Sequence, residues 1–151
     1  MVDQRQDAQA LATAASQAMW ARDNCSQGLG MELTEVTPGG AVMRMRVRPD
    51  MTNGHKTCHG GFVFMLADSA FAFACNSYNL NTVGSACTID YLAPVFEGDM
   101  LEAVAVERST TGRTGVYDVT VRKVDGPVIA LFRGKSYRVR GEVIAGLAEA
   151  S

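Results

Sequence analysis

The chain has 151 residues, of which 47% are hydrophobic and 20% charged. This length and composition fit a single globular domain over residues 1–151 and exclude an intrinsically disordered protein. Fourteen basic residues oppose sixteen acidic ones, and the net charge of -2 argues against extended binding to nucleic acid.

The N-terminus and the cysteines indicate a reducing, cytoplasmic setting. Residues 1–9 are polar and include acids, which is typical of neither a signal peptide nor a transit peptide. The longest apolar stretch is interrupted at Asp68 and Ser69 and is too short to span a bilayer. The cysteines show no CxxC pair and no zinc spacing. We therefore expect no metal, no cofactor and no membrane contact, and reduced thiols, mostly buried or inert, at Cys25, Cys58, Cys75 and Cys87.

The first third of the chain is predicted to form a helix and a hairpin. Apolar residues recur at helical spacing over about 4–20, which indicates an amphipathic N-terminal helix. A loop is expected over 24–30. A short strand is expected over 31–36, and 37–40 carry a strong Thr-Pro-Gly-Gly turn signal. Apolar residues then alternate with mostly basic ones over 41–48, as in a strand with one face exposed to solvent.

The remainder combines a central helix with strands. A polar loop over 49–59 leads into a segment from Gly60 to about Tyr78 that is apolar on every side, which predicts a helix buried all round. The strands that follow have the spacing of an antiparallel meander and are expected at 83–92, 100–108, 114–123 and 128–140. The tail over 141–151 is expected to be loose. The predicted fold class is α+β, with a curved antiparallel β-sheet wrapped around a long central α-helix.

Asp68 is the only Asp, Glu, Lys or Arg between Lys56 and Asp90. Burying a carboxylate is costly, so a fold keeps one where partners satisfy it or where its chemistry is needed. A carboxylate so placed can activate water or attack an acyl carbon. The alternative is that Asp68 only accepts hydrogen bonds from a loop or a helix cap.

Two glycines, Gly60 and Gly61, stand where the central helix begins. A helix N-terminus presents free backbone N–H groups, and glycine lets a ligand approach them closely. The pair therefore suits an oxyanion or a polarised carbonyl. The alternative is that the glycines only form the turn.

The spacing between Gly61 and Asp68 has a consequence for assembly. The two residues share a helical face but lie about 10 Å apart along the axis. A base and an oxyanion donor must each come within about 3 Å of the reacting group, which one helix cannot arrange for one carbonyl. A two-fold axis would bring an antiparallel copy of the helix alongside. If the acid and the glycines act together, we expect a homodimer with shared active sites.

His55 and His59 are the only histidines, and Cys58 lies between them. Their spacing leaves a metal site as one alternative and a Cys58–His nucleophilic pair as another. No acidic residue lies close by in sequence, and the glycines disfavour a continuous helix through both histidines. We expect no metal here and assign His59 to the geometry of the loop. Asn53 either orients water or a substrate carbonyl or simply forms a turn with Gly54.

Taken together, these motifs resemble the signature of the hotdog-fold acyl-CoA thioesterases, within the group that acts in phenylacetic acid degradation. The resemblance runs from about residue 24 to about residue 140, and the set of motifs is specific although His-Gly-Gly alone is weak. Its central part is Asn53-Gly54-His55, His59-Gly60-Gly61 and Asp68. Further matching stretches are 66–68 (LAD), 72–77 (AFACNS), 85–91 (SACTIDY), 114–118 (TGVYD) and 130–136 (ALFRGKS).

The resemblance implies a hotdog fold and side-by-side dimers that pair into tetramers. It makes Asp68 the nucleophile or general base and has the Gly60 amide polarise a thioester carbonyl. Asn53 then places the substrate or the water, and His59 shapes the loop. The implied reaction is hydrolysis of an aryl-acetyl-CoA, with or without ring hydroxylation, to the free acid and coenzyme A.

Coenzyme A is anionic, so basic residues are expected at its phosphates. The candidates are Arg113 in a turn, four residues of the last strand, and a second basic row: Arg133, Lys135, Arg138 and Arg140, then Arg44, Arg46 and Arg48. For most of them a solvated strand face is the better interpretation, and Arg138 and Lys135 are singled out. The expected substrate-binding set is Gly61, Ser69, Ser85, Arg113, Lys135 and Arg138.

Two other functions compete with hydrolysis. A hotdog hydratase carries an Asp and a His five residues apart, but Phe73 stands at that distance from Asp68, and a dehydratase needs a helix Glu that this segment lacks. A non-catalytic acyl-CoA-binding module would not need Asp68. Thiol release from phenylacetyl-CoA separates hydrolysis from binding alone.

Overall fold

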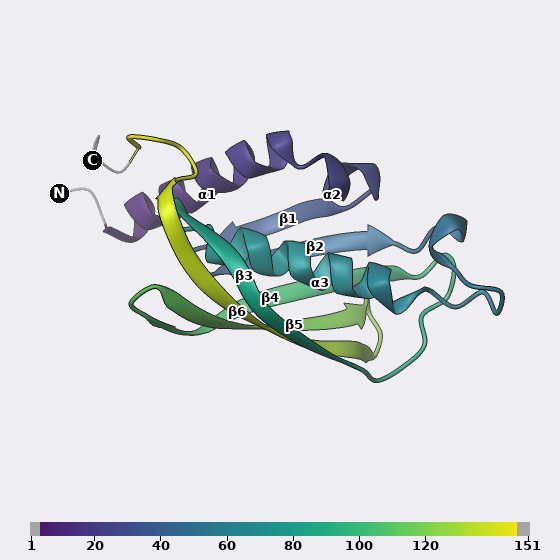
Figure 1. The fold of residues 1–151 in the computed structure, drawn as a ribbon. Coiled ribbons are helices and arrows are strands. Elements are labelled where there is room, and N and C mark those ends of the chain that lie inside the picture. The colour runs from purple at the N-terminus through teal and green to yellow at the C-terminus, as the bar shows by residue number, and fades with distance from the viewer. Residues whose placement is uncertain (1–3, 148–151) are drawn as a thin grey trace.

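The computed structural model describes residues 4–147, in which a curved sheet holds α3 in its hollow while α1 lies along β1 (Figure 1). The strands are antiparallel and lie in the order β1-β2-β4-β5-β6-β3. No helix in this described part is long and apolar enough to cross a membrane. The elements are α1 (Gln4–Arg22), α2 (Asn24–Gly28), β1 (Glu32–Thr37), β2 (Gly40–Arg46), η1 (Pro49–Met51), α3 (Gly60–Cys75), β3 (Leu80–Tyr91), β4 (Met100–Thr111), β5 (Thr114–Lys123) and β6 (Val128–Glu142).

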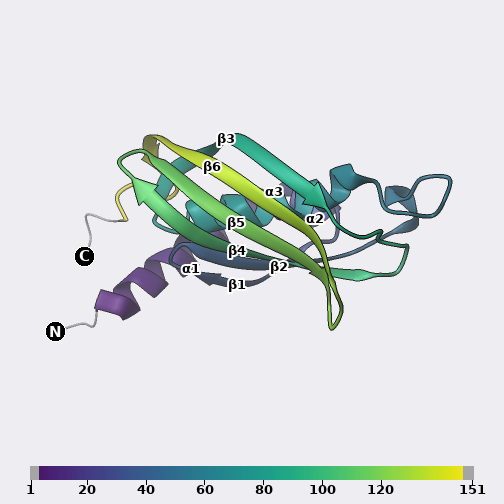
Figure 2. The ribbon, with the colours of Figure 1, turned by 90° about the horizontal axis from the view of Figure 1, so that it is seen from below.

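The core lies between α3 and the concave face of the sheet. The view from below shows the outer side of the sheet, with α3 behind the strands (Figure 2). Phe71 of α3 packs edge-on to Tyr117 of β5 with ring centroids 5.6 Å apart, and it tilts against Phe132 of β6 at 5.9 Å. A Cβ atom on Gly134 would lie 2.8 Å from the Phe71 ring. Only glycine therefore lets α3 come this close to β6.

The predicted sheet around a central helix is confirmed, but the predicted meander is only partly right. Strands β4, β5 and β6 follow one another as expected. β3 does not lie beside β4, because it pairs with β6, and β4 pairs with β2 instead. The cause is α3, which carries the chain across the sheet so that β3 enters at the edge opposite β1.

The predicted N-terminal helix is confirmed, whereas two neighbouring boundaries differ from expectation. Residues 24–28 form a short helix rather than a loop, because the Asp23 side chain accepts a hydrogen bond from a first-turn amide at 2.9 Å and caps it. Helix α3 stops at Cys75, earlier than predicted. The Asn76 side chain bonds to both the backbone N–H and the carbonyl of Thr82 at 2.9 Å, which turns the chain into β3.

The C-terminal segment is held in place as far as it is described, so the expected loose tail is wrong at its start. The Asn79 side chain bonds to the backbone N–H and carbonyl of Ile144 at 2.8 and 2.9 Å. The Asn79 carbonyl also accepts a bond from the Val143 amide at 3.1 Å. These contacts dock the segment after β6 against the end of α3, and 148–151 lie outside the described residues.

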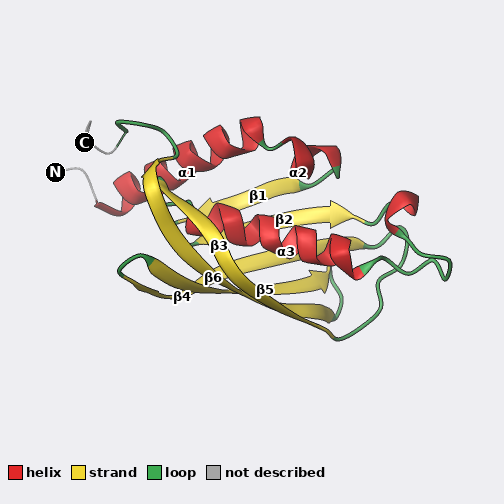
Figure 3. Cartoon of the chain, viewed as in Figure 1, coloured by secondary structure: helices red, strands yellow, loops and turns green. Residues whose placement is uncertain are grey.

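Two loops meet at the end of the molecule where α3 begins (Figure 3). Thr57 forms a β-bridge with Phe96, and the Cys58 amide donates to the Val95 carbonyl at 2.7 Å. The loop between β2 and α3 is thereby tied to the connection between β3 and β4. This junction fixes where the His-Gly-Gly sequence enters the helix.

Candidate active site

One stripe of α3 is left uncovered by the sheet. Gly61 is exposed, and Met65, Asp68 and Ala72 are partly exposed. Steps of four, three and four residues keep these positions on one helical face. The prediction that α3 is buried all round is therefore wrong for this stripe, because the sheet covers only the opposite side. The stripe is open to a ligand or to another subunit.

The Asp68 carboxylate has no hydrogen-bond donor in the described part of the chain. Burial raises its pKa above the ordinary 3.8. Burial and, after it, the charge of Asp68 also raise the pKa of the Cys87 thiol on β3, so the acid faces that edge strand. Within residues 4–147 the Asp68 carboxylate thus accepts no hydrogen bond from a loop or a cap, and it is a candidate for chemistry.

The amides of Gly60 and Gly61 donate no hydrogen bond to any group within residues 4–147. The preceding amides of Cys58 and His59 do bond, at 2.7 and 2.8 Å, to backbone carbonyls of neighbouring segments. A Cβ atom on Gly61 would meet nothing within 4 Å, so the space beside it is open. The helix therefore begins with two free N–H groups on a fixed backbone, a suitable place for a polarised carbonyl.

Asn53 organises the loop before the helix. Its side-chain oxygen accepts three hydrogen bonds, from the His55 amide and from the amide and hydroxyl of Thr57. Its NH₂ group donates to no group that the structure describes. Asn53 thus forms the turn and keeps a free donor, which combines the two alternatives drawn from the sequence.

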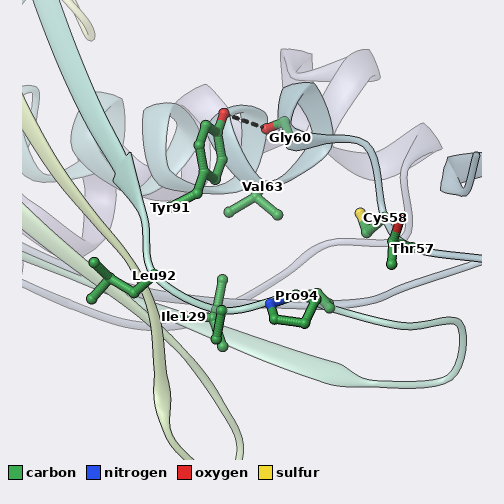
Figure 4. A pocket seen from close by; sticks show the side chains of 10 residues that line it. Thr57, Cys58, Gly60, Val63, Tyr91, Leu92, Pro94 and Ile129 are labelled. Atoms are coloured by element: carbon green, nitrogen blue, oxygen red, sulfur yellow. Dashed lines mark hydrogen bonds between the residues drawn. The ribbon is translucent and has the colours of Figure 1, made fainter.

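A pocket of about 570 Å³ opens beside the first turn of α3 (Figure 4). Val63, Leu92 and Pro94 give it an apolar lining. Tyr91 stands against Gly60, and its hydroxyl donates to the Gly60 carbonyl at 2.8 Å. The sequence placed Tyr91 in the matching stretch 85–91 but indicated no role for it, because an aromatic residue at a strand end is equally typical of a core. An apolar pocket beside free amides can hold an acyl group with its carbonyl at the helix N-terminus.

The histidines and Cys58 do not form a reactive pair. The side chains of His55 and His59 are exposed and make no hydrogen bond in the described chain. Burial raises the pKa of the Cys58 thiol, which donates to the His59 carbonyl at 3.4 Å and is not activated as a thiolate. The described residues contain no group of three His, Cys, Asp or Glu side chains that could hold a metal ion. All four cysteines are free thiols, as expected; Cys75 is buried, Cys58 and Cys87 are partly buried, and Cys25 is exposed. Burial raises the pKa of the first three, which is typical of inert thiols.

Two of the predicted substrate-binding hydroxyls are engaged within the chain. The Ser69 hydroxyl is buried and lies 3.1 Å from that of Ser26, which links α3 to α2. The exposed Ser85 stands at a bulge in β3 and donates to the Lys135 carbonyl at 3.1 Å. Neither hydroxyl lines the pocket beside Gly60.

The structure brings Arg113 and Arg138 together but separates them from Lys135. The Arg113 guanidinium donates to the Arg138 carbonyl at 3.2 Å, and both residues line a pocket of about 310 Å³ next to Cys75 and Tyr78, past the C-terminal end of α3. Lys135 lies on the outer face of β6, because exposed odd-numbered residues alternate there with buried even-numbered ones over 131–136. Arg113 and Arg138 are thus the predicted cations that line a pocket.

The chain matches the family model described as the thioesterase superfamily over residues 55–130. It is 48% identical over 126 residues to the acyl-coenzyme A thioesterase PaaI of Escherichia coli strain K12, over 83% of this chain and 90% of that protein. The solved structure of E. coli PaaI, from the phenylacetic acid degradation operon, matches with a TM-score of 0.87 at 46% identity, over 89% of this chain and 97% of that one.

A mutant structure of the phenylacetic acid degradation protein PaaI from Thermus thermophilus matches with a TM-score of 0.72 at 40% identity, over 76% of this chain and 97% of that one. The sequence relationship and the structural match thus agree over most of the chain. The chain is therefore a thioesterase: it belongs to the thioesterase superfamily and has its hotdog fold.

Proposed function

We propose that this chain is a cytoplasmic acyl-CoA thioesterase that hydrolyses aryl-acetyl-CoA, such as phenylacetyl-CoA or its ring-hydroxylated forms. The observation that carries the proposal is the unpartnered Asp68 carboxylate on the same open stripe of α3 as the free Gly61 amide. Acyl transfer needs a base or nucleophile and an oxyanion donor, and these are the two groups present. The name of the E. coli relative supports CoA thioesters as substrates, and the operon of its solved structure supports phenylacetate degradation as the setting.

The proposed active unit is a homodimer, because Asp68 and the glycines of one α3 lie too far apart for one carbonyl. The outer edge of β3 has no partner strand within the described chain, and residues 83–86 of β3 are all exposed instead of alternating. An edge strand of this kind is a template for pairing. Antiparallel pairing of two β3 edges would set two α3 stripes side by side, so that Asp68 faces the partner subunit's Gly61. By the family resemblance, two such dimers form a tetramer.

The proposed reaction places the thioester carbonyl at the free amides of Gly60 and Gly61, with the Asn53 NH₂ group orienting the substrate or the water. As general base, Asp68 takes a proton from water while the water oxygen bonds to the acyl carbon. As nucleophile, its carboxylate bonds to the acyl carbon first, and water then cleaves the mixed anhydride. In both routes the carbon–sulfur bond breaks, and the leaving thiolate takes a proton to give coenzyme A.

Arg113 and Arg138 are the proposed contacts for the coenzyme A phosphates. In the antiparallel dimer, their pocket lies at the end of α3 that approaches the partner subunit's glycine loop. A thioester held at that loop would extend its nucleotide portion toward the two guanidinium groups, which suit phosphate geometry. Lys135, Ser69 and Ser85 have no part in this arrangement and stay predictions from the sequence.

The decisive experiment measures thiol release from a panel of short-chain, long-chain and aromatic acyl-CoA esters. Wild type should release thiol fastest from phenylacetyl-CoA. Asp68→Asn should lower kcat by about 10²–10⁴-fold, the usual effect of losing a general base. Asp125→Asn, in an exposed turn with φ 59 where Asn is well tolerated, is the matched control and should retain wild-type activity.

Two outcomes would reject the proposal. Binding of CoA esters without thiol release would assign a binding module, and hydration of an enoyl-CoA would assign a hydratase. The role of Asp68 is read separately from a single turnover in ¹⁸O-labelled water. Label incorporated into the Asp68 carboxylate identifies a nucleophile, whereas label found only in the product acid, with no acylated Asp68 trapped by quenching during the turnover, identifies a general base.

A further inference from the structure

We propose that Tyr91 is a positioning residue for thioester hydrolysis, whose hydroxyl fixes the Gly60–Gly61 peptide and thereby aims the free Gly61 amide at the substrate carbonyl. The inference deepens the proposed function and rests on it. It assigns a specific task to an exposed side chain at the end of the matching stretch 85–91, for which the sequence alone indicated no role.

The geometry links the Tyr91 hydroxyl to the reacting amide through a single peptide unit. The hydroxyl donates to the Gly60 carbonyl at 2.8 Å. That carbonyl and the Gly61 N–H belong to the same planar peptide group, so a bond that holds the oxygen also sets the direction of the N–H. Hydrogen bonding at the oxygen further polarises the N–H, by about 10–30% in condensed-phase estimates. The Gly61 N–H itself has no acceptor in the described chain.

The two glycines lack side chains for different reasons, and Tyr91 accounts for one of them. A Cβ atom on Gly60 would lie 2.8 Å from Cζ and 2.9 Å from the hydroxyl oxygen of Tyr91. A Cβ atom on Gly61 would meet nothing within 4 Å. Gly60 thus makes room for the tyrosine, and Gly61 leaves room for a ligand.

The setting of Tyr91 suits a fixed donor. It is the last residue of β3, and the next amide, that of Leu92, donates to the Ile129 carbonyl at 2.8 Å. Tyr91 is 52% exposed and borders the apolar pocket, and its hydroxyl points to Gly60 at the start of α3 (Figure 4). Burial of the hydroxyl and, after it, the nearby Cys58 raise the pKa of Tyr91 above 10, so the hydroxyl keeps its proton in neutral solution.

The test is Tyr91→Phe, which removes the hydroxyl and keeps the ring. Because one hydrogen bond contributes about 0.5–1.5 kcal/mol, kcat for phenylacetyl-CoA should fall by about 2- to 13-fold with KM changed by less than about twofold. Tyr137→Phe, at another exposed tyrosine, is the control and should keep wild-type kcat. A second readout is the infrared carbonyl stretch of phenylacetyl-CoA bound to Asp68→Asn, which should move toward its free-solution frequency when Tyr91→Phe is added.

A pair of further variants separates positioning from simple packing. Gly60→Ala should lose activity and stability because its Cβ displaces the tyrosine ring. Gly60→Ala combined with Tyr91→Ala should regain the thermal stability of Tyr91→Ala alone but not the wild-type kcat. Recovery of wild-type kcat in this double variant would contradict the proposal.

The outcomes for Tyr91 and for the reaction itself are distinguishable. An active wild type with an equally active Tyr91→Phe and an unmoved carbonyl stretch would overturn the role of Tyr91 and leave the proposed function intact. A wild type that releases no thiol from any ester would overturn the proposed function and this inference with it.

Discussion

The side-chain oxygen of Asn53 accepts hydrogen bonds from both the backbone amide and the hydroxyl of Thr57, at 3.2 and 2.9 Å. With the His55 amide at 2.9 Å, this oxygen is fully engaged inside the loop. The planar amide must then turn its NH₂ group away from these three donors. One side chain thus closes the loop with its acceptor and presents a donor to whatever occupies the space beyond.

Substitution of Asn53 should therefore separate loop stability from catalysis. Asn53→Asp keeps the accepting oxygen but loses the NH₂ donor, so kcat should fall by about 10²-fold while the melting temperature stays near that of wild type. Asn53→Ala removes the acceptor as well and should also destabilise the fold by about 1–3 kcal/mol, since three donors lose their partner. Thermal unfolding and steady-state kinetics of both variants provide the measurement, and equal stability loss in both would contradict this separation.

Asp68 should affect stability and activity in opposite directions. Because burial raises its folded pKa above 3.8, ionisation costs stability as pH rises from 3.8 through the folded pKa. Asp68→Asn should therefore melt at a higher temperature than wild type in neutral solution, with no difference below pH 3.8. In wild type, kcat/KM should fall on acidification with an apparent pKa above 3.8. A matched set of melting curves from pH 3 to 8 checks the first statement, and a pH–rate profile checks the second.

Shared active sites should be visible by mixing inactive chains. Asp68→Asn lacks the acid, and Gly61→Val blocks the open space beside the free amide without a steric clash inside its own chain. A dimer with one chain of each kind contains one intact site, so random exchange of equal amounts should restore about a quarter of wild-type activity. Each variant mixed with itself is the control. If exchange gives no gain in activity although sedimentation verifies the dimers, Asp68 of one chain and the glycines of the other do not act on the same carbonyl.

Glu102 should contribute stability that disappears in acid. It stands directly opposite Arg44 on β2 and Arg122 on β5, and both guanidinium groups bond to it at 2.9–3.1 Å. Burial alone would raise its pKa, but the hydrogen bonds from both arginines outweigh burial and lower the pKa below 4.5. Glu102→Gln should destabilise the fold by about 1–2 kcal/mol in neutral solution. The difference should be present above pH 4.5 and vanish as pH falls through the folded pKa, which denaturant titrations at several pH values would reveal.

Arg138 should act on substrate binding and not on the chemical step. Arg138→Ala should raise KM for phenylacetyl-CoA by about 10- to 100-fold with kcat little changed, since one charged contact to phosphate contributes roughly 1.5–3 kcal/mol. The effect should shrink for a substrate truncated to the pantetheine thioester, which carries no nucleotide. Lys135→Ala is the comparison variant on the opposite sheet face, and an equal rise in KM there would contradict the assignment.

The sequence predicted most elements because their signals are local. Both ends of the strand Thr114–Lys123 were predicted correctly, since its alternating apolar residues and the turns on either side are typical of a β-strand with these bounds. The strand order was not predictable in the same way. Which strand pairs with β6 depends on the edge of the sheet at which the chain leaves α3, and this is determined by long-range packing. The short helix after Asp23 was missed because its cap offers a single hydrogen bond within a polar segment.

For the site, the motif residues were predictable, whereas their surroundings were not. Gly60, Gly61 and Asp68 were identified from an isolated acid and a glycine pair in an apolar run. Tyr91 lies about thirty residues further on and meets Gly60 only through the fold. The open stripe of α3 was also missed, because an apolar helix gives no sign of which of its sides the sheet leaves uncovered.

The entry to α3 is held by backbone bonds, from the amide of Cys58 to Val95 and from that of His59 to Met51. Such bonds are indifferent to side-chain identity. The positions whose side chains face the pocket, such as Leu92 and Pro94, can therefore change over evolution without moving the glycine amides. A fold built in this way allows the acyl specificity of descendants to drift while the machinery for breaking the thioester stays fixed.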